Sequence, residues 1–404
     1  MSDPQGPAAQ GDHSLTSHSG PEDDEWKNTI VFSAGTSWDQ MWPSERHLAD
    51  NVADMAPVLF LDPPVSVGRS PSGLATRRTD RLRLIRPGLA RFTPLAPPGM
   101  TRPLVNYQTA RMLRHQLAWA VGELHATVDA LVACQIGLRV FGACSERLRV
   151  LYGTDDFVAG AELMGLPRAR LRSLERDAVR EADVVFAVSS PLVDLWRGQG
   201  ADPILLPNGC DAAAFRRVDG AASPPDVHLP RPIVGFSGHL SDRIDIGLLE
   251  AVAATGVSLL LVGPRQRTVD ARVFERLLSR PNVQWVGARK FEELPSYLSV
   301  MDVGITPYLQ TDFNRASFPL KTLEYLAAGL PAVVTDLPAA QSLSSVVRVC
   351  SGREEFVRGV AEALHQHRDP KAVQARRLVA EQYSWRERAV EFLSRIREGR
   401  PAEA

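Results

Sequence analysis

Residues 318–336, FPLKTLEYLAAGLPAVVTD, decide how the rest of the chain is interpreted. Pro319 suits the first position of a helix, because the N–H that proline lacks would have no partner there. Apolar residues then recur at helical spacing and predict a stripe that faces the core: Leu320, Leu323 and Ala327. Gly329, with a proline two residues later, predicts the end of this helix, and 332–335 has the pattern of a short buried strand.

Two polar residues of this helix stand together. Lys321 and Glu324 are three residues apart and therefore share one flank. The unpaired N–H groups at a helix start attract anions, and a lysine strengthens that attraction. A cation and a helix start for phosphate, with a carboxylate for hydroxyls, suit a phosphorylated sugar nucleotide. A solvent-exposed Lys–Glu pair on an ordinary helix is the alternative interpretation.

The same stretch resembles the nucleotide-binding segment of GT-B glycosyltransferases of the "glycosyl transferases group one" type. There, two glutamates separated by seven residues precede a helix of small residues, a Gly, a Pro and a strand. Glu324 and the residues that follow it match the second half, whereas Ala316 stands at the position of the first glutamate. The resemblance implies that Glu324 holds the ribose hydroxyls, and that the glutamate that approaches the donor sugar is missing.

Length and composition are those of a soluble globular enzyme. A chain of 404 residues is long enough for two or three domains, and 44% hydrophobic and 23% charged residues are ordinary values. A net charge of −1 gives no electrostatic argument for nucleic acid as a partner.

The cysteines and the N-terminal segment indicate the cellular compartment in which we expect the protein. The four cysteines show neither metal-ligand spacing nor a disulfide framework: Cys134, Cys144, Cys210 and Cys350. We expect them to be reduced and the protein to be cytoplasmic. No apolar run approaches the roughly 18 residues that span a bilayer. The polar, acidic segment 1–27 is expected to be disordered and not to act as a signal peptide.

The chain after this tail predicts a βαβ unit. A buried strand over 29–34, a helix from 43 to 52 and a strand over 58–61 indicate a parallel sheet. Gly35 follows the first strand, at the edge where doubly wound sheets bind ligands, although a lone glycine is equally consistent with a simple turn.

Three further residues of this half are candidates for the acceptor side. Trp38, like Trp42, can stack on a sugar or lipid acceptor, or be buried at a domain interface. Asp155 and its neighbour Asp156 follow a predicted strand over 148–152, which permits a metal pair, a helix cap or a place in an acceptor cleft. His47 or Asp155 would serve as the base if the reaction inverted the anomeric configuration, although His47 also fits a partly exposed helix position.

The middle of the chain carries a second resemblance. Residues 207–211, Pro-Asn-Gly-Cys-Asp, with a phenylalanine four residues later, resemble the segment that closes the first domain of group-one transferases, although Pro-Asn-Gly also forms simple turns. The predicted organisation is a disordered tail 1–27, an acceptor-side Rossmann-like domain 28–215, a linker 216–231, a nucleotide-sugar-binding domain 232–370 and a C-terminal helix 371–404 that packs back on the first domain.

A second βα series begins at 233–236. Gly238 and His239 form the tight loop after that strand, and a helix capped by Ser241 or Asp242 is expected to carry Arg243 in its first turn. The family places an arginine here for the donor phosphates and a lysine a few residues later. Arg243 matches, the lysine is missing, and we hypothesise that Lys321 replaces it. An ion pair of Arg243 with Asp242 or Asp245 is the alternative.

Other donor-side candidates follow from the resemblance. Gly263 ends the strand predicted over 258–262, and Val286 and Gly287 are expected to read the nucleobase through backbone groups. The helix start supplies Phe318, Pro319 and Leu320, and the polar loop 311–317 is expected to face the donor sugar. A final helix over 371–396, interrupted at 383–385, would let Trp385 pack at the domain junction.

Together these features predict an α/β protein with two Rossmann-like domains that face a cleft. The predicted function is transfer of a sugar from a nucleotide-diphosphate donor to a sugar, lipid or natural-product acceptor, without metal or other cofactor and with retention implied by the resemblance. Two alternatives remain open: an impaired GT-B subunit that assists another transferase, and a nucleotide-sugar epimerase. No nucleic-acid partner is expected, and peripheral membrane contact is compatible with the sequence.

Overall fold

The computed structural model describes residues 25–39, 43–67, 78–99, 103–162, 165–366 and 369–399. The chain forms two compact units. The first runs to Tyr152 and includes Glu181–Asp183 and the chain end from Gly399, and the second comprises Gly153–Arg180 and Val184–Glu398. Trp26 is already buried, so the prediction of disorder through Lys27 is wrong at 25–27.

The N-terminal sheet has eight strands in the order β10-β9-β8-β7-β1-β2-β5-β4, and only the β4–β5 pair is antiparallel among the pairings described. Its strands are β1 (Thr29–Ser33), β2 (Val58–Leu61), β4 (Leu82–Arg86), β5 (Leu89–Phe92), β7 (Val128–Ala133), β8 (Leu148–Gly153), β9 (Val184–Ala187) and β10 (Ile204–Leu205). A two-stranded sheet joins β3 (Val65–Ser66) to β6 (Leu95–Ala96). β1 lies between β2 and β7, so the strand order reverses there, and Gly35 follows β1.

The second sheet is parallel throughout, in the order β13-β12-β11-β14-β15-β16. Its strands are β11 (Ile233–Ser237), β12 (Ser258–Val262), β13 (Val283–Trp285), β14 (Val303–Thr306), β15 (Ala332–Thr335) and β16 (Val347–Cys350). Counted from β11, this is the strand order 3-2-1-4-5-6 of a Rossmann fold, in which ligands bind at the carboxyl ends of the strands where the order reverses. Here that position lies between β11 and β14.

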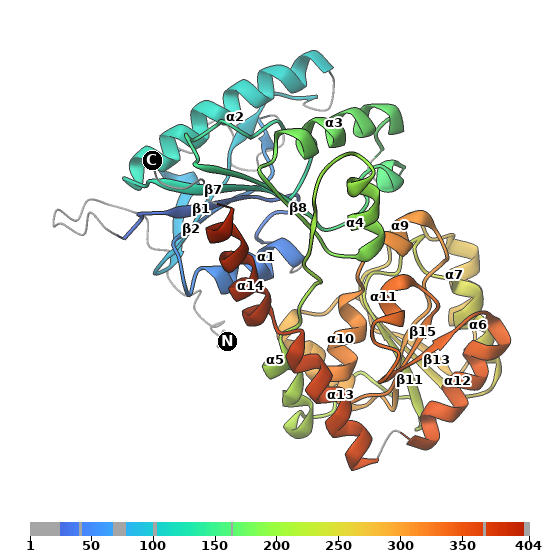
Figure 1. Cartoon of the computed structure of the whole chain (residues 1–404). Coiled ribbons are helices and arrows are strands. Elements are labelled where there is room, and N and C mark those ends of the chain that lie inside the picture. Colours follow the sequence, from blue (N-terminus) through green and yellow to red (C-terminus); the bar gives the residue numbers. More distant parts are fainter. Residues whose placement is uncertain are drawn as a thin grey trace, which may run out of the picture. The chain divides into compact units, whose positions relative to one another are not determined.

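Helices connect these strands, as Figure 1 shows. In the described chain they are α1 (Ser44–Val52), α2 (Pro103–Glu123), α3 (Arg168–Glu181), α4 (Ser190–Arg197), α5 (Ala212–Arg216), α6 (Ile246–Ala254), α7 (Ala271–Leu278), α8 (Leu294–Ser299), α9 (Asp312–Ala316), α10 (Leu320–Ala327), α11 (Pro338–Gln341), α12 (Arg353–Gln366), α13 (Pro370–Gln382) and α14 (Trp385–Glu398). None of the helices in the described ranges combines the length and the apolar character needed to cross a bilayer.

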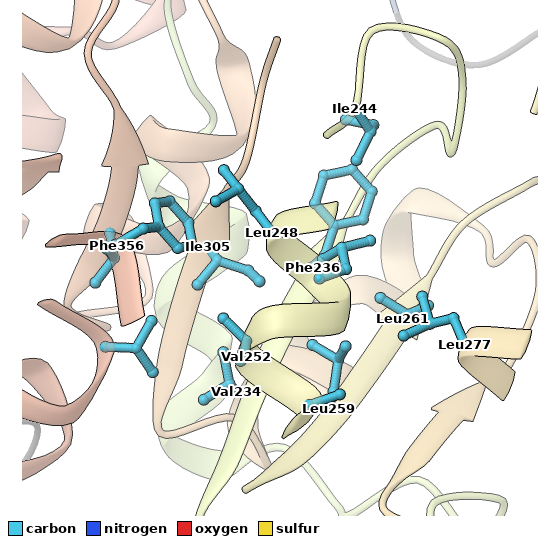
Figure 2. Packing of buried hydrophobic residues seen from close by; sticks show 14 of the residues in the cluster. Val234, Phe236, Ile244, Leu248, Val252, Leu259, Leu261, Leu277, Ile305 and Phe356 are labelled. Atoms are coloured by element: carbon cyan, nitrogen blue, oxygen red, sulfur yellow. The ribbon is translucent and has the colours of Figure 1, made fainter. Parts of the chain in front are cut away.

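The core of the second unit lies between its sheet and the helices α6, α7 and α12. Figure 2 shows Leu248 and Val252 of α6 packed over Val234 and Leu259, with Phe356 of α12 beside them. All five side chains are at most 5% exposed. Alternate residues of a strand face opposite sides of the sheet, so the residues between these core positions face the other layer of helices.

The last helix is interrupted where the sequence predicts it. α13 ends at Gln382 and α14 begins at Trp385, and the break pairs with the Pro-Asn-Gly segment: the Cys210 N–H donates to Tyr383 O at 2.7 Å. Trp385 is 3% exposed. Further along α14, the Phe392 ring lies 5.0 Å from the ring of Phe186 in β9. The terminal helix therefore packs on a strand of the N-terminal sheet.

Candidate functional site

Helix α10 is fixed to the carboxyl ends of β11 and β14 by one tyrosine. The Tyr325 hydroxyl accepts the Ser237 N–H at 2.8 Å and donates to Ile305 O at 3.3 Å. Gly304 makes this possible, because a Cβ there would lie 2.4 Å from the Tyr325 ring. The start of α10 therefore lies at the ligand-binding edge of the Rossmann-type sheet. The sequence predicted Pro319 at the first position of the helix. In the structure Pro319 is the N-cap residue, and the helix begins at Leu320.

The predicted Lys–Glu pair is present, but it is not a surface pair. Lys321 Nζ lies 3.8 Å from Glu324 Oε1, and the Glu324 side chain is only 9% exposed. Burial raises the pKa of Glu324, and the charge of Lys321 opposes that shift. Glu324 Oε2 is buried and has no hydrogen-bond partner in the described chain. A buried carboxylate oxygen without a donor is costly, so it is an acceptor suited to a ligand hydroxyl.

Two glycine loops meet beside Lys321. Gly263 has a φ of +132°, and a Cβ built on it would lie 2.0 Å from Gly238 O. Gly238 has a φ of +154°, and its Cβ would lie 3.0 Å from Lys321 Cε. The Gly238 N–H donates to Val262 O at 2.8 Å, which fixes one loop to the end of β12. Backbone therefore approaches backbone under the lysine, as a phosphate-binding edge requires.

The structure corrects the prediction that Arg243 lies in the first turn of a helix. α6 begins only after Asp245, whose carboxylate accepts the Leu248 N–H at 3.2 Å and caps the helix. Before this cap the chain pairs with the segment after β14, where the Leu309 N–H donates to Arg243 O at 2.9 Å. Arg243 is therefore held in a loop by tertiary hydrogen bonds, and the N-terminus of α6 does not present it.

The Arg243 side chain is held firmly in place. Its Nε donates to Asn314 Oδ1 at 2.8 Å, and its Nη2 donates to Ser317 Oγ at 2.8 Å. The guanidinium carbon lies 4.7 Å from the ring centre of Phe313 and 5.2 Å from that of Tyr308. A guanidinium with oriented hydrogen bonds and aromatic neighbours is pre-organised for a planar anion.

Asn314, which the sequence suggested for contact with sugar hydroxyls or for a solvated loop, has a role that sequence reasoning missed. It is fully buried, and its Nδ2 donates to Arg243 O at 3.0 Å and to Leu309 O at 2.9 Å, so it holds the arginine by both backbone and side chain. The predicted polar loop 311–317 is instead the short helix α9, capped by Thr311. No ion pair to Arg243 is found in the described chain, so the predicted alternative of a salt bridge to Asp242 or Asp245 is wrong.

Charged neighbours complete this part of the second unit. Desolvation, and then the charges of Lys321 and Arg243, lower the pKa of His239. Burial raises the pKa of Asp155 to about 6, while Arg243 opposes the shift and Asp156 adds to it. Asp156 itself accepts the Ala159 N–H at 2.7 Å, which is the capping role considered for this pair. The charge of Arg243 therefore acts on the carboxylate of Asp155.

The raised pKa of Asp155 predicts that the stability of the fold depends on pH. Its pKa in the folded chain, about 6, lies above its usual 3.8, so the folded state binds this proton more tightly. The stability from this group is fully present below its unfolded pKa and is lost as the pH rises through about 6. We expect this pH-dependent loss of unfolding free energy to be smaller in Asp155→Asn than in the wild type, by on the order of 1 kcal/mol. This value is discounted because Asp155 is partly exposed to solvent. Urea unfolding at several pH values measures this, and parallel curves for both proteins would contradict it.

The remaining donor-side candidates lie on the same loops or at the helix start. The Gly263 N–H donates to Gly287 O at 2.8 Å, which joins the loops after β12 and β13, and the Val286 N–H donates to Leu261 O at 3.0 Å. Phe318 O accepts the Asn208 Nδ2 at 2.9 Å, so the Pro-Asn-Gly segment holds the start of α10. Pro319 is buried and Leu320 is half-buried.

The acceptor-side candidates Gly35, Trp38 and His47 belong to the first unit. Trp38 is 7% exposed and packs edge-on against Phe60 at 4.9 Å, which agrees with burial and leaves little ring surface for stacking. His47 is 7% exposed on α1, so the prediction of a partly exposed histidine is wrong. Trp42, a further stacking candidate, lies outside the described residues. The described ranges contain no cluster of three His, Cys, Asp or Glu that could hold a metal ion.

Comparison with known proteins gives a family match within the second unit. Residues 231–370 match the family described as "Glycosyl transferases group 1". We call residues 231–370 the group 1 segment, because the similarity to this family covers that part of the chain. The group 1 segment contains Arg243 and Glu324, on which the resemblance was based, so the predicted resemblance is confirmed. TuaH of Bacillus subtilis, whose name assigns it to teichuronic acid biosynthesis as a glycosyltransferase, is 33% identical over 159 residues. That match spans 38% of this chain and 40% of TuaH.

Solved structures extend the likeness from the group 1 segment to nearly the whole chain. A sucrose-phosphate synthase from Thermosynechococcus elongatus has a TM-score of 0.70 at 16% identity, over 92% of this chain and 98% of its own. A trehalose-6-phosphate synthase structure from E. coli, bound with UDP-2-fluoro glucose, gives 0.66 at 11% identity, over 92% and 98%. Anabaena HepE in complex with UDP gives 0.61 at 16%, over 92% and 99%. These likenesses show the fold, and the predicted GT-B fold is confirmed.

Proposed function

We propose that this protein is a glycosyltransferase that takes its sugar from a nucleoside-diphosphate donor. One observation carries the proposal: Glu324 places an unpartnered, buried carboxylate oxygen next to Lys321, at the strand edge where Gly238 and Gly263 meet. Two cationic side chains and a carboxylate on a Rossmann-type edge fit the diphosphate and the ribose of one ligand. The match of residues 231–370 to the group 1 family model supports the same assignment.

The diphosphate would lie between Arg243 and Lys321. Arg243 is already oriented by Asn314 and Ser317, so binding an anion costs it little reorganisation. The first-turn N–H groups of α10 add a partial positive charge next to Lys321. Glu324 Oε2 would accept a ribose hydroxyl, which supplies the donor that this oxygen lacks.

The chemistry requires a stabilised leaving group above all. The bond from the anomeric carbon to the phosphate oxygen breaks as a bond to the acceptor hydroxyl oxygen forms, and the acceptor proton passes to the departing phosphate. Arg243 and Lys321 would stabilise the negative charge of the nucleoside diphosphate without a metal ion. In this proposal the acceptor attacks from the same face and the anomeric configuration is retained.

We expect the first unit to bind the acceptor, with Gly35, Trp38 and His47 as its candidate residues, and Asp155 of the second unit as a candidate for contact with the reacting groups. Uridine is the first base to test, because two proteins of similar fold were solved with UDP or a UDP-sugar. The backbone groups of Val286 and Gly287 would read that base. The charge of Arg243 acts on the carboxylate of Asp155, which makes Asp155 a candidate for contact with the reacting groups.

Removing the lysine tests the donor site. Lys321→Ala deletes the charge beside Gly238 and Glu324, and we expect the dissociation constant of the nucleotide to rise by about tenfold or more. Isothermal titration with UDP or the preferred nucleotide measures it. Lys371→Ala, at an exposed position of α13, is the matched control and should bind as the wild type does. An unchanged affinity for Lys321→Ala would remove this lysine from the site.

The function is tested by offering donors to the pure protein. Thermal-shift measurements with UDP, GDP, dTDP and ADP sugars should identify one nucleotide that raises the melting temperature. Slow release of that nucleotide, unchanged by EDTA, supports a metal-independent transferase, and NMR of the product gives the anomeric configuration. Interconversion of the sugar would indicate an epimerase instead. Absence of both binding and turnover would favour a subunit that assists another enzyme.

A further inference from the structure

A cavity in the first unit has no part in the proposed function. It has a volume of about 650 Å³ and lies between α2 (Figure 1) and the two-stranded sheet of β3 and β6. This volume falls within the roughly 300–1,000 Å³ of sites that bind small molecules.

The wall of the cavity is largely apolar. Val67, Leu95 and Met112 contribute to it, and Met112 is 41% exposed. Contact with water is unfavourable for apolar side chains at an open cavity. Exposed apolar surfaces of this kind commonly mark binding sites.

The base of the cavity is held together by the hydrogen bonds of one buried glutamine. Gln116 is 6% exposed, and its side-chain amide donates to Leu95 O at 2.8 Å and accepts the Leu95 N–H at 3.0 Å. The same amide oxygen accepts Arg81 Nη1 at 2.8 Å. One buried glutamine therefore joins α2 to β6 and to the short helix Arg78–Arg81, and the shape of the cavity is preformed.

The rim of the cavity carries positive charge. The guanidinium groups of Arg81 and Arg111 supply this charge, His115 lies beside them, and no carboxylate is among the described residues that line the cavity. Nor does the sequence of α2 contain an acidic residue before Glu123, its last. Within the described ranges, no carboxylate pairs with Arg111. A basic rim around an apolar interior complements an anion that carries a hydrocarbon chain.

We propose that this cavity binds the apolar chain of an anionic lipid, with the lipid phosphate at Arg111 and His115. A neutral apolar ligand would not interact with the charged rim, and a soluble anion would not cover the apolar interior. The phosphate would interact with the arginine while the chain covers Met112. This proposal does not depend on the transferase activity, because it rests on residues of the first unit alone.

Vesicle co-sedimentation tests the proposal. The purified full chain should sediment with vesicles of phosphatidylglycerol and phosphatidylcholine, and not with phosphatidylcholine alone. Arg111→Glu and Met112→Glu should each weaken this binding by about fivefold or more, because a surface charge near anionic lipid contributes about that factor. Two matched controls carry the same changes at exposed positions of the second unit, Arg272→Glu and Leu378→Glu, and should sediment as the wild type does.

Each outcome decides the matter. Loss of binding confined to the two cavity variants supports the proposal, and melting temperatures equal to that of the wild type would show that they are folded. No binding of the wild type to anionic vesicles overturns it. Equal binding by all five proteins overturns the location. A self-association abolished by Met112→Glu, without vesicle binding, would assign the cavity to a second copy of the chain. Failure of the nucleotide experiments would leave these measurements unaffected.

Discussion

Replacing Arg243 by alanine is expected to lower kcat/KM for the sugar donor by at least about a hundredfold. The loss of one pre-oriented donor that stabilises transition-state charge typically costs a factor of about 10² to 10³. Arg243 meets this description, because Asn314 and Ser317 fix its guanidinium before any ligand arrives. Steady-state release of nucleotide from the donor identified by thermal shift measures the effect.

The comparison needs a control for structure and one for charge. Arg243→Ala leaves the buried Asn314 Oδ1 without its donor, so the melting temperature should be recorded alongside activity. Arg243→Lys keeps a positive charge but cannot reproduce the two directed hydrogen bonds, and we expect most of the loss to persist. Arg272→Ala, at an exposed position of α7, should leave kcat/KM unchanged. Activity of Arg243→Ala within threefold of wild type would overturn the proposed diphosphate site.

The local part of this site could be predicted from sequence. Lys321 and Glu324 face the same way because a helix places residues three apart on one flank, and the structure confirms their contact. The helix end at Gly329 and the following strand were predicted by residue type alone, and Gly329 has the expected positive φ of +81°. Contacts between neighbours on one element depend on little more than the geometry of that element.

The long-range part could not be predicted. Asn314 and Arg243 are 71 residues apart, and no local pattern shows that one holds the other. The predicted cap at Ser241 or Asp242 failed because Asp245 was an equally good cap, and pairing with the segment after β14 decided between them. Lys321 and Glu324 were predicted to lie on an exposed or an anion-facing flank, but the burial of Glu324 depends on packing that several elements create.

The meeting of the two glycine loops is another such contact, and it leads to the second large effect. Gly263→Ala is expected to lower the melting temperature by about 5–15 °C and to abolish the shift produced by nucleotide. The φ of +132° disfavours any L side chain, and the new Cβ would lie 2.0 Å from Gly238 O, which is backbone and cannot rotate away. The loop after β11 would have to move, and with it the surface beneath Lys321.

A matched glycine separates the two causes of this loss. Gly256 also has a positive φ, +86°, but a Cβ there meets no atom within 4 Å. Gly256→Ala therefore measures backbone strain alone, expected at about 1–2 kcal/mol, and it should keep the nucleotide shift. The additional loss in Gly263→Ala then reports the contact between the two loops. Equal destabilisation by the two substitutions, with nucleotide binding kept in both, would mean that the loops can separate without cost and that their contact does not shape the donor site.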